Sequence, residues 1–199
     1  MPTFDIENEK LQEGYKYICG CDEAGRGPLC GPVVAAAVIL PFDAEIEGLN
    51  DSKKLTEKKR ELLFDVIKEK AIAYAIAEAS PEEIDDINIL NASMLAMRRA
   101  VDMLSVKADY ALIDGNCSRG FSIPTQTVVK GDAKSASIAA ASILAKVARD
   151  RQCKELDALY PEYNIAKHKG YPTKDHMDAV RKYGPSPIHR KTFLKFLDK

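Results

Sequence analysis

The sequence predicts an α/β domain in which helices are layered on a mixed β-sheet. Short apolar runs typical of strands come first and then alternate with helical patterns, which is the order expected of such a domain. The chain has 199 residues, with 46% hydrophobic and 30% charged residues, as in ordinary globular proteins. No repeat or linker interrupts it, so we expect a single domain over residues 1–199.

Five segments have the pattern of strands. Residues 17–22 (YICGCD) and 32–40 (PVVAAAVIL) lie on either side of a glycine-rich turn. In residues 71–77, Ile72, Tyr74 and Ile76 alternate with alanines, and this period of two predicts a third strand. Residues 110–114 (YALID) and 125–129 (TQTVV) complete the set.

Helical patterns fill the intervals. Residues 56–70 place apolar side chains on one face, and Ser80 followed by Pro81 and Glu83 forms a capping box. Met94, Met97, Val101 and Leu104 recur at helical spacing, which predicts a core-facing apolar stripe rather than a cofactor contact. Residues 135–152 are rich in alanine, and residues 173–183 end at Gly184. Residues 192–199 are amphipathic, which fits either a tail that docks a partner or a helix that packs on its own domain, and we expect the helix.

Several classes of protein are excluded. No apolar run reaches the ~18–20 residues that a membrane span requires, and the acidic N-terminus does not resemble a secretion signal, so we expect a cytoplasmic protein. The five cysteines include no C-x-x-C pair, and Cys19 and Cys21 are interpreted as thiols on opposite faces of a strand. No cysteine or histidine spacing fits a zinc site.

The charges are unevenly distributed along the chain. The net charge is −1, but residues 1–129 hold 14 Lys and Arg against 22 Asp and Glu, whereas residues 130–199 hold 15 against 8. An acidic portion that binds cations and a basic portion that binds phosphates would have this balance. A chance distribution over solvated surfaces explains it equally well.

Acidic residues stand at the ends of two predicted strands. Asp22 and Glu23 end the first strand, and Asp114 ends the fourth. If these strands are neighbours with level ends, their backbones lie ~4.8 Å apart and the carboxylates converge. Asp132, ahead of the alanine-rich helix, could complete the cluster. For any one of these acids taken alone, a helix cap or a surface charge is the commoner explanation.

The donor chemistry of this cluster points to a hard cation. Carboxylate oxygens without histidine or cysteine favour Mg²⁺ or Mn²⁺ over zinc. Two such ions can activate a water and neutralise the leaving oxygen of a phosphodiester.

The turn Gly25-Arg26-Gly27 invites comparison with nucleotide-binding loops. The Walker A pattern fails because Arg26-Gly27 stands where Lys followed by Ser or Thr is required. The dinucleotide fingerprint fails at Cys30 and because a strand follows. Either these glycines let the backbone approach a ligand, with Arg26 supplying charge, or they form a plain hairpin turn.

Residues 20–34 (GCDEAGRGPLCGPVV) closely resemble the opening motif of the type 2 ribonucleases H, the ribonuclease HII family. Further matching segments follow in the same order along residues 17–193. They are residues 51–55 (DSKKL), 113–116 (IDGN), 130–132 (KGD), 137–146 (SIAAASILAK), 168–173 (HKGYPT) and 184–193 (GPSPIHRKTF). Cys21 and Cys30 stand where other small or apolar residues are usual.

This resemblance implies a ribonuclease H-like fold, with a mixed five-stranded sheet flanked by helices. Residues 1–16 would form a lead, and residues 153–199 a C-terminal helical extension on the catalytic core. The implied catalytic and metal-binding residues are Asp22, Glu23, Asp114 and Asp132, with Asp22 bridging two Mg²⁺ or Mn²⁺ ions in the substrate complex.

The implied activity is endonucleolytic cleavage of RNA in RNA/DNA hybrids, including cleavage 5′ of a lone ribonucleotide in duplex DNA. The products would carry 3′-hydroxyl and 5′-phosphate ends, and the role would be in replication and repair. The backbone of Gly25, Arg26 and Gly27, together with Tyr171, would read the 2′-hydroxyl. The candidate phosphate contacts are Lys53, Lys54, Lys134 and Ser135.

Alternatives to these assignments remain. By composition alone, Tyr171 would be a partly buried core aromatic, and Lys53 and Lys54 a solvated basic stretch. His168, His176 and His189 are expected to be structural or polar partners near the site.

The expected partners are RNA/DNA hybrid and ribonucleotide-containing duplex DNA, with no membrane, bound by a monomer. Sixteen residues before the first strand are too few for the extra N-terminal domain of ribonuclease HIII, which favours type HII. A non-catalytic hybrid-binding module is the alternative function, but it would require an incomplete acidic cluster.

Overall fold

The computed structural model describes residues 1–198, and position 199 of the predicted C-terminal helix lies outside the described residues. One sheet contains all the strands named here, in the order β3-β2-β1-β4-β5. Their bounds are β1 Ile18–Ala24, β2 Val33–Ile39, β3 Ala73–Ala79, β4 Tyr110–Asp114 and β5 Thr125–Val128. The prediction of a mixed five-stranded sheet is confirmed.

The register of the central strands brings the predicted acids to one edge. β1 runs parallel to β4, with Cys21 opposite Ile113, so Asp22 and Asp114 are the next residues along the paired strands. β2 is antiparallel to both β1 and β3. The short stretch 25–32 connects it to β1, whereas residues 40–72, which include a helix, connect it to β3.

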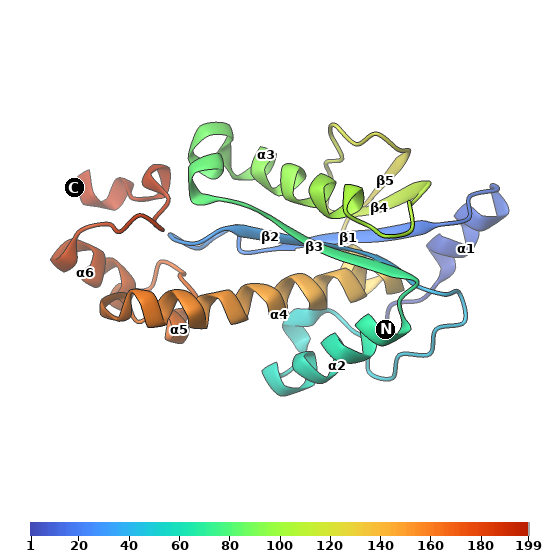
Figure 1. Cartoon of the computed structure of the whole chain (residues 1–199), viewed down its shortest axis with the longest axis horizontal. Coiled ribbons are helices and arrows are strands. Elements are labelled where there is room, and N and C mark those ends of the chain that lie inside the picture. The colour runs from blue at the N-terminus through green and yellow to red at the C-terminus, as the bar shows by residue number, and fades with distance from the viewer. Residues whose placement is uncertain (199) are drawn as a thin grey trace.

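Helices cover both faces of the sheet (Figure 1). Their bounds are α1 Asp5–Gln12, α2 Glu57–Lys70, α3 Pro81–Asp102, α4 Ala136–Leu159, α5 Ile165–His168 and α6 Lys174–Tyr183. Figure 1 shows α3 on one face, α4 with α2 on the other, and the C-terminal elements gathered at one end. The capping box of Ser80 and Glu83 is present at the start of α3. A backbone kink at Asn88, which has a φ of 67°, divides α3.

The structure departs from the sequence-based expectations in four places. The lead contains α1, which no pattern predicted, and α4 continues to Leu159. The C-terminal tail forms the short 3₁₀ turns η4 (Lys191–Phe193) and η5 (Lys195–Asp198) in place of one helix. The assignment of Cys19 and Cys21 to opposite faces is wrong. Residues two apart in a strand share a face, and these sulfurs lie 3.9 Å apart.

Helix α4 crosses β1 with its backbone in close approach. A Cβ atom on Gly20 would collide with the backbone of Ser137 and Ile138, so only glycine allows this crossing. Asp22 follows two residues later on the same face of β1. The crossing therefore brings the next turns of α4 alongside the acidic edge.

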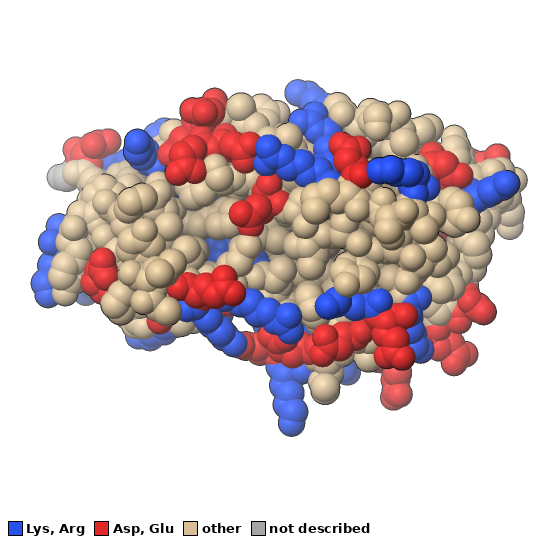
Figure 2. All heavy atoms as spheres, viewed as in Figure 1, with Lys and Arg blue, Asp and Glu red and all other residues tan. Residues whose placement is uncertain are grey.

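The described residues contain no helix long and apolar enough to span a membrane. On the face shown in Figure 2, acidic and basic side chains lie side by side along the lower edge. Ion pairs such as Arg151–Glu61 and Lys154–Glu57 join the basic portion of the sequence to the acidic portion.

Candidate active site

Asp22 is the most enclosed acid of the cluster, with a relative exposure of 5%. One of its oxygens accepts a hydrogen bond from the backbone N–H of Glu23 at 2.7 Å. Burial, followed by the charges of Glu23 and Asp114, holds the pKa of Asp22 well above its usual range. Such crowding of negative charge is relieved by a bound cation.

Glu23 is the penultimate residue of the same strand, beside the turn. Its carboxylate lies 3.3 Å from a guanidinium nitrogen of Arg26. Burial raises the pKa of Glu23, and the charge of Arg26 only partly offsets that effect.

Asp114, the last residue of β4, is hydrogen-bonded to the turn that carries Asp132. Its Oδ1 accepts a hydrogen bond from the N–H of Gly131 at 2.6 Å, which fixes the short 3₁₀ turn η2 (Gly131–Ala133) against the strand. Asp132 lies in that turn and is buried. Burial and the charges of Asp51 and Asp114 raise the pKa of Asp132. The four predicted acids therefore lie at one edge, carried by β1, β4 and η2.

Asp51 is a fifth acid near this edge, to which the sequence analysis assigned no role. It precedes the 3₁₀ turn η1 (Ser52–Lys54), and its carboxylate accepts a hydrogen bond from the N–H of Lys53 at 2.9 Å. Its charge acts on Asp132. In the sequence, the one sign of a role for Asp51 is that it is the first residue of the matching segment 51–55.

Lys53 brings positive charge to the acids. Its Nζ lies 3.9 Å from Asp132, although 80% of the side chain is exposed. Burial lowers the pKa of Lys53, but the charges of Asp132 and Asp22 outweigh that effect and raise it overall. Lys54 is also exposed, in the same turn.

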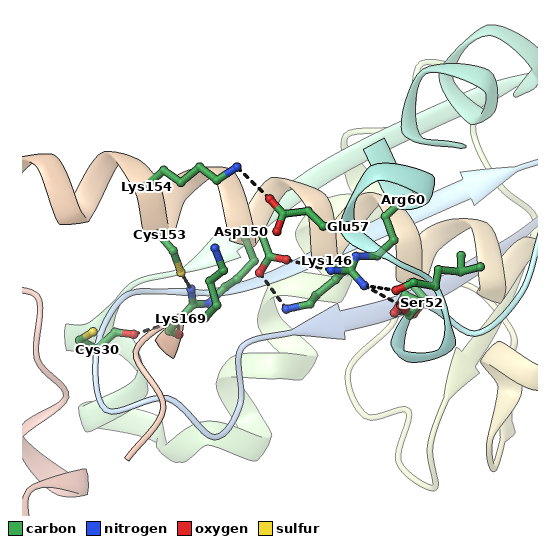
Figure 3. Close-up of polar contacts among 12 residues, drawn as sticks. Cys30, Ser52, Glu57, Arg60, Lys146, Asp150, Cys153, Lys154 and Lys169 are labelled. Atoms are coloured by element: carbon green, nitrogen blue, oxygen red, sulfur yellow. Dashed lines mark hydrogen bonds and ion pairs between the residues drawn. The ribbon is translucent and has the colours of Figure 1, made fainter. Parts of the chain in front are cut away.

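A polar network ties η1 to α4 (Figure 3). Arg60 donates to the backbone carbonyl oxygens of Ser52 at 3.0 Å and Leu55 at 2.6 Å, and lies 3.5 Å from Asp150 on α4. Lys146 pairs with the same aspartate at 2.7 Å. The position of Lys53 is therefore set by α2 and α4 as well as by its own turn.

The acidic edge opens into a cleft of about 210 Å³. Its lining includes Asp22, Glu23, Lys53, Tyr171 and residues 25–27, which we call the glycine loop. Gly25 has a φ of +96°, and a Cβ atom there would collide with the side chain of Arg149. This position therefore requires glycine for two independent reasons.

Tyr171 faces the glycine loop across the cleft. Its relative exposure is 46%, which excludes the interpretation as a core aromatic. Its ring lies beside Gly27.

Lys134 and Ser135 lie at the start of α4. Lys134 is exposed. Ser135 is fully buried, caps α4 by accepting from the N–H of Ile138, and donates to Glu7 of α1 at 2.7 Å. These bonds give the hydroxyl a structural task, and its burial does not support the expected phosphate contact.

Behind the cleft, His176 and His189 approach each other with their Nε2 atoms 3.2 Å apart. With Cys30 they form a buried group whose ligand-type atoms lie within 4.8 Å of one another. The two facing nitrogens are paired with each other, and burial raises the pKa of the Cys30 thiol to about 12. The oxygen-rich acidic edge, by contrast, offers the donors that Mg²⁺ and Mn²⁺ prefer.

The family model described as Ribonuclease HII matches residues 19–196. The chain is 56% identical over 196 residues to the ribonuclease HII of Clostridioides difficile (strain 630), covering 98% of this chain and 77% of that protein.

Solved structures agree with the fold. The ribonuclease H2 of Pyrococcus horikoshii OT3 superposes with a TM-score of 0.75 at 29% identity, covering 92% of this chain and 97% of that one. Bst-RNase HIII in complex with Mn²⁺ superposes with a TM-score of 0.66 at 18% identity, over 93% of this chain and 66% of that one.

Proposed function

Because this chain belongs to the ribonuclease HII family, and is therefore a ribonuclease, we propose that it cleaves the RNA strand of RNA/DNA hybrids and cuts 5′ of single ribonucleotides in duplex DNA. One observation carries the proposal: the acidic pair Asp22 and Glu23, the glycine loop and Tyr171 line the same cleft. Groups able to hold a metal thus lie beside groups able to contact a sugar.

The cofactor of this proposal is Mg²⁺ or Mn²⁺, with two ions expected in the substrate complex. Asp22, Glu23, Asp114 and Asp132 would hold them, because these carboxylates crowd one another and Lys53 only partly offsets their charge. When bound, the ions would activate the attacking water and neutralise the leaving oxygen.

The chain's own residues would select and orient the substrate. The glycine loop presents backbone without side-chain bulk at residues 25 and 27, so a sugar can approach it closely. The half-exposed ring of Tyr171 would pack against the ribonucleotide. Contacts to the 2′-hydroxyl distinguish RNA from DNA.

Phosphate groups would be oriented by the basic side of the cleft. Lys53, Lys146 and Lys169 are among the residues that line the cleft. Such contacts fix register without reading sequence. We propose that the protein acts as a monomer.

The alternative is a binding module without catalysis on the same fold. The presence of all four carboxylates at one edge favours the enzyme.

The test uses a labelled DNA duplex with one ribonucleotide, an RNA/DNA hybrid and an all-DNA control, each with Mg²⁺, Mn²⁺ or chelator. We expect metal-dependent cleavage 5′ of the ribonucleotide and none of the control. Binding without cleavage under every metal condition would favour the binding module. Cleavage restricted to the hybrid would support the proposed cleavage of RNA in hybrids and would contradict the proposed cleavage at single ribonucleotides.

A further inference from the structure

A C-terminal segment pairs with the chain that carries the glycine loop. Residues 186–192, which we call the C-terminal segment, form an antiparallel bridge between His189 and Cys30. The N–H of Arg190 donates to the carbonyl oxygen of Leu29 at 2.8 Å, and the N–H of Gly31 donates to that of Ile188 at 2.9 Å. The segment therefore acts as a short strand behind the cleft.

The guanidinium of Arg190 is fully buried under the glycine loop. It donates to five backbone carbonyl oxygens, those of Gly25 (2.7 Å), Arg26 (3.0 Å), Pro28 (2.8 Å), Gly31 (2.9 Å) and Pro32 (3.2 Å). A guanidinium has five N–H groups, so every donor is used. These carbonyls precede and follow Gly27, so one side chain fixes the course of the loop on both sides of it.

The C-terminal segment is itself anchored from the opposite side. The carboxylate of Asp85, on α3, accepts from the N–H of Lys191 at 2.8 Å, and from the N–H and hydroxyl of Thr192 at 3.0 and 2.6 Å. Asp85 is remote in sequence from the cleft, yet it holds the backbone next to Arg190.

His189, the preceding residue, supports the other wall of the cleft. Its Nδ1 accepts from the N–H of Ser186 at 3.1 Å, so its Nε2 carries the proton and donates to His176. The Nδ1 of His176 donates to the carbonyl oxygens of Gly170 at 3.0 Å and Tyr171 at 3.1 Å. Consecutive residues of one segment thus hold the glycine loop and the backbone of Tyr171.

We infer that Arg190 is a positioning residue that sets the glycine loop against Tyr171, and thereby sets the selection of a single ribonucleotide. The inference rests on the proposed function, because it explains how the proposed active-site cleft selects its substrate. A continuous hybrid offers many ribonucleotides and tolerates a displaced loop, whereas a lone ribonucleotide offers one position.

The decisive variant is Arg190→Lys, which keeps the charge but has three donors and no planar fork. The measured quantity is kcat/KM on the single-ribonucleotide duplex divided by kcat/KM on the uniform hybrid. We expect Arg190→Lys to lower this ratio roughly tenfold or more. A residue that only stabilised the fold would lower both values together.

Two further variants complete the design. Asp85→Asn weakens only the outer anchor, so we expect a fall of the ratio of about twofold to threefold. The matched control Arg181→Lys changes an exposed arginine that pairs with Asp178, and we expect no change in the ratio. Circular dichroism and thermal unfolding establish that each variant is folded.

The outcomes separate the two proposals. A wild-type protein that cleaves no ribonucleotide-containing substrate overturns the proposed function. Wild-type cleavage with an unchanged ratio in a folded Arg190→Lys overturns the inference. If Arg190→Lys does not fold, Asp85→Asn decides: a lowered ratio supports the inference and an unchanged one overturns it.

Discussion

Gly27 faces the ring of Tyr171 so closely that a Cβ atom at residue 27 would lie 3.2 Å from Cε1 of the tyrosine. The two residues belong to distant parts of the chain, the β1–β2 connection and the segment after α5. A side chain at residue 27 would therefore press against the ring in its present position.

The first prediction concerns this contact. Gly27→Ala leaves the backbone unstrained but pushes the half-exposed ring aside, so we expect kcat/KM on the single-ribonucleotide duplex to fall about tenfold with little loss of stability. In a Tyr171→Ala background the same substitution should have little further effect, because the ring is already gone. Strictly additive losses in the double-mutant cycle would contradict the contact.

Asp114→Asn separates catalysis from binding. The amide keeps an oxygen that can accept from the N–H of Gly131, so η2 stays in place while one negative charge is removed. We expect turnover to fall by about 10²-fold or more and hybrid affinity to change only a few-fold. Asp43→Asn, at an exposed position, is the control. Unchanged turnover in Asp114→Asn would remove this residue from the metal site.

Metal binding should depend on pH. The pKa values of Asp22, Glu23 and Asp132 are raised, mainly by burial, so these carboxyls hold protons to a higher pH than usual. A cation must displace those protons, so Mn²⁺ affinity should fall as the pH is lowered, starting at a higher pH than for ordinary carboxylates. Calorimetry in two buffers of different ionisation enthalpy measures the protons released. The Asp22→Asn variant should release fewer protons on Mn²⁺ binding. Equal proton release would argue against Asp22 as a metal ligand.

The buried histidine pair predicts a stability change in the acid range. Burial, followed by the charge of His176, lowers the pKa of His189 to about 4. Its unfolded-state pKa is about 6.5, so between these values the unfolded chain binds more protons and stability falls as pH falls. The full effect is about 3 kcal/mol, at ~1.4 kcal/mol per pKa unit.

Denaturant unfolding of the wild type and His189→Asn at pH 7.5, 6 and 5 measures this effect. The difference in unfolding free energy should shrink as pH falls, because the variant lacks the group that must be charged. Comparing the two proteins cancels the contribution of the carboxylates. A constant difference across this range would show that His189 does not titrate as described.

Local sequence patterns were sufficient for the sheet, most helices and the acids at the strand ends. Strand periodicity and caps depend on neighbouring residues, so the patterns ending in Asp22 and Asp114 are readable without the fold. The sequence analysis expected these acids to converge if the two strands were neighbours. The parallel pairing of β1 and β4 meets that condition.

The burial and the hydrogen-bond partners of individual side chains depend on contacts between distant segments. Ser135 is an unremarkable serine in the sequence, and only its packing against Glu7 of α1 shows it to be buried. Arg190 lies in a polar stretch typical of a surface, yet folding encloses it among five carbonyl oxygens far away in the chain. Burial and hydrogen bonding depend on which segments meet, and no local pattern encodes that meeting.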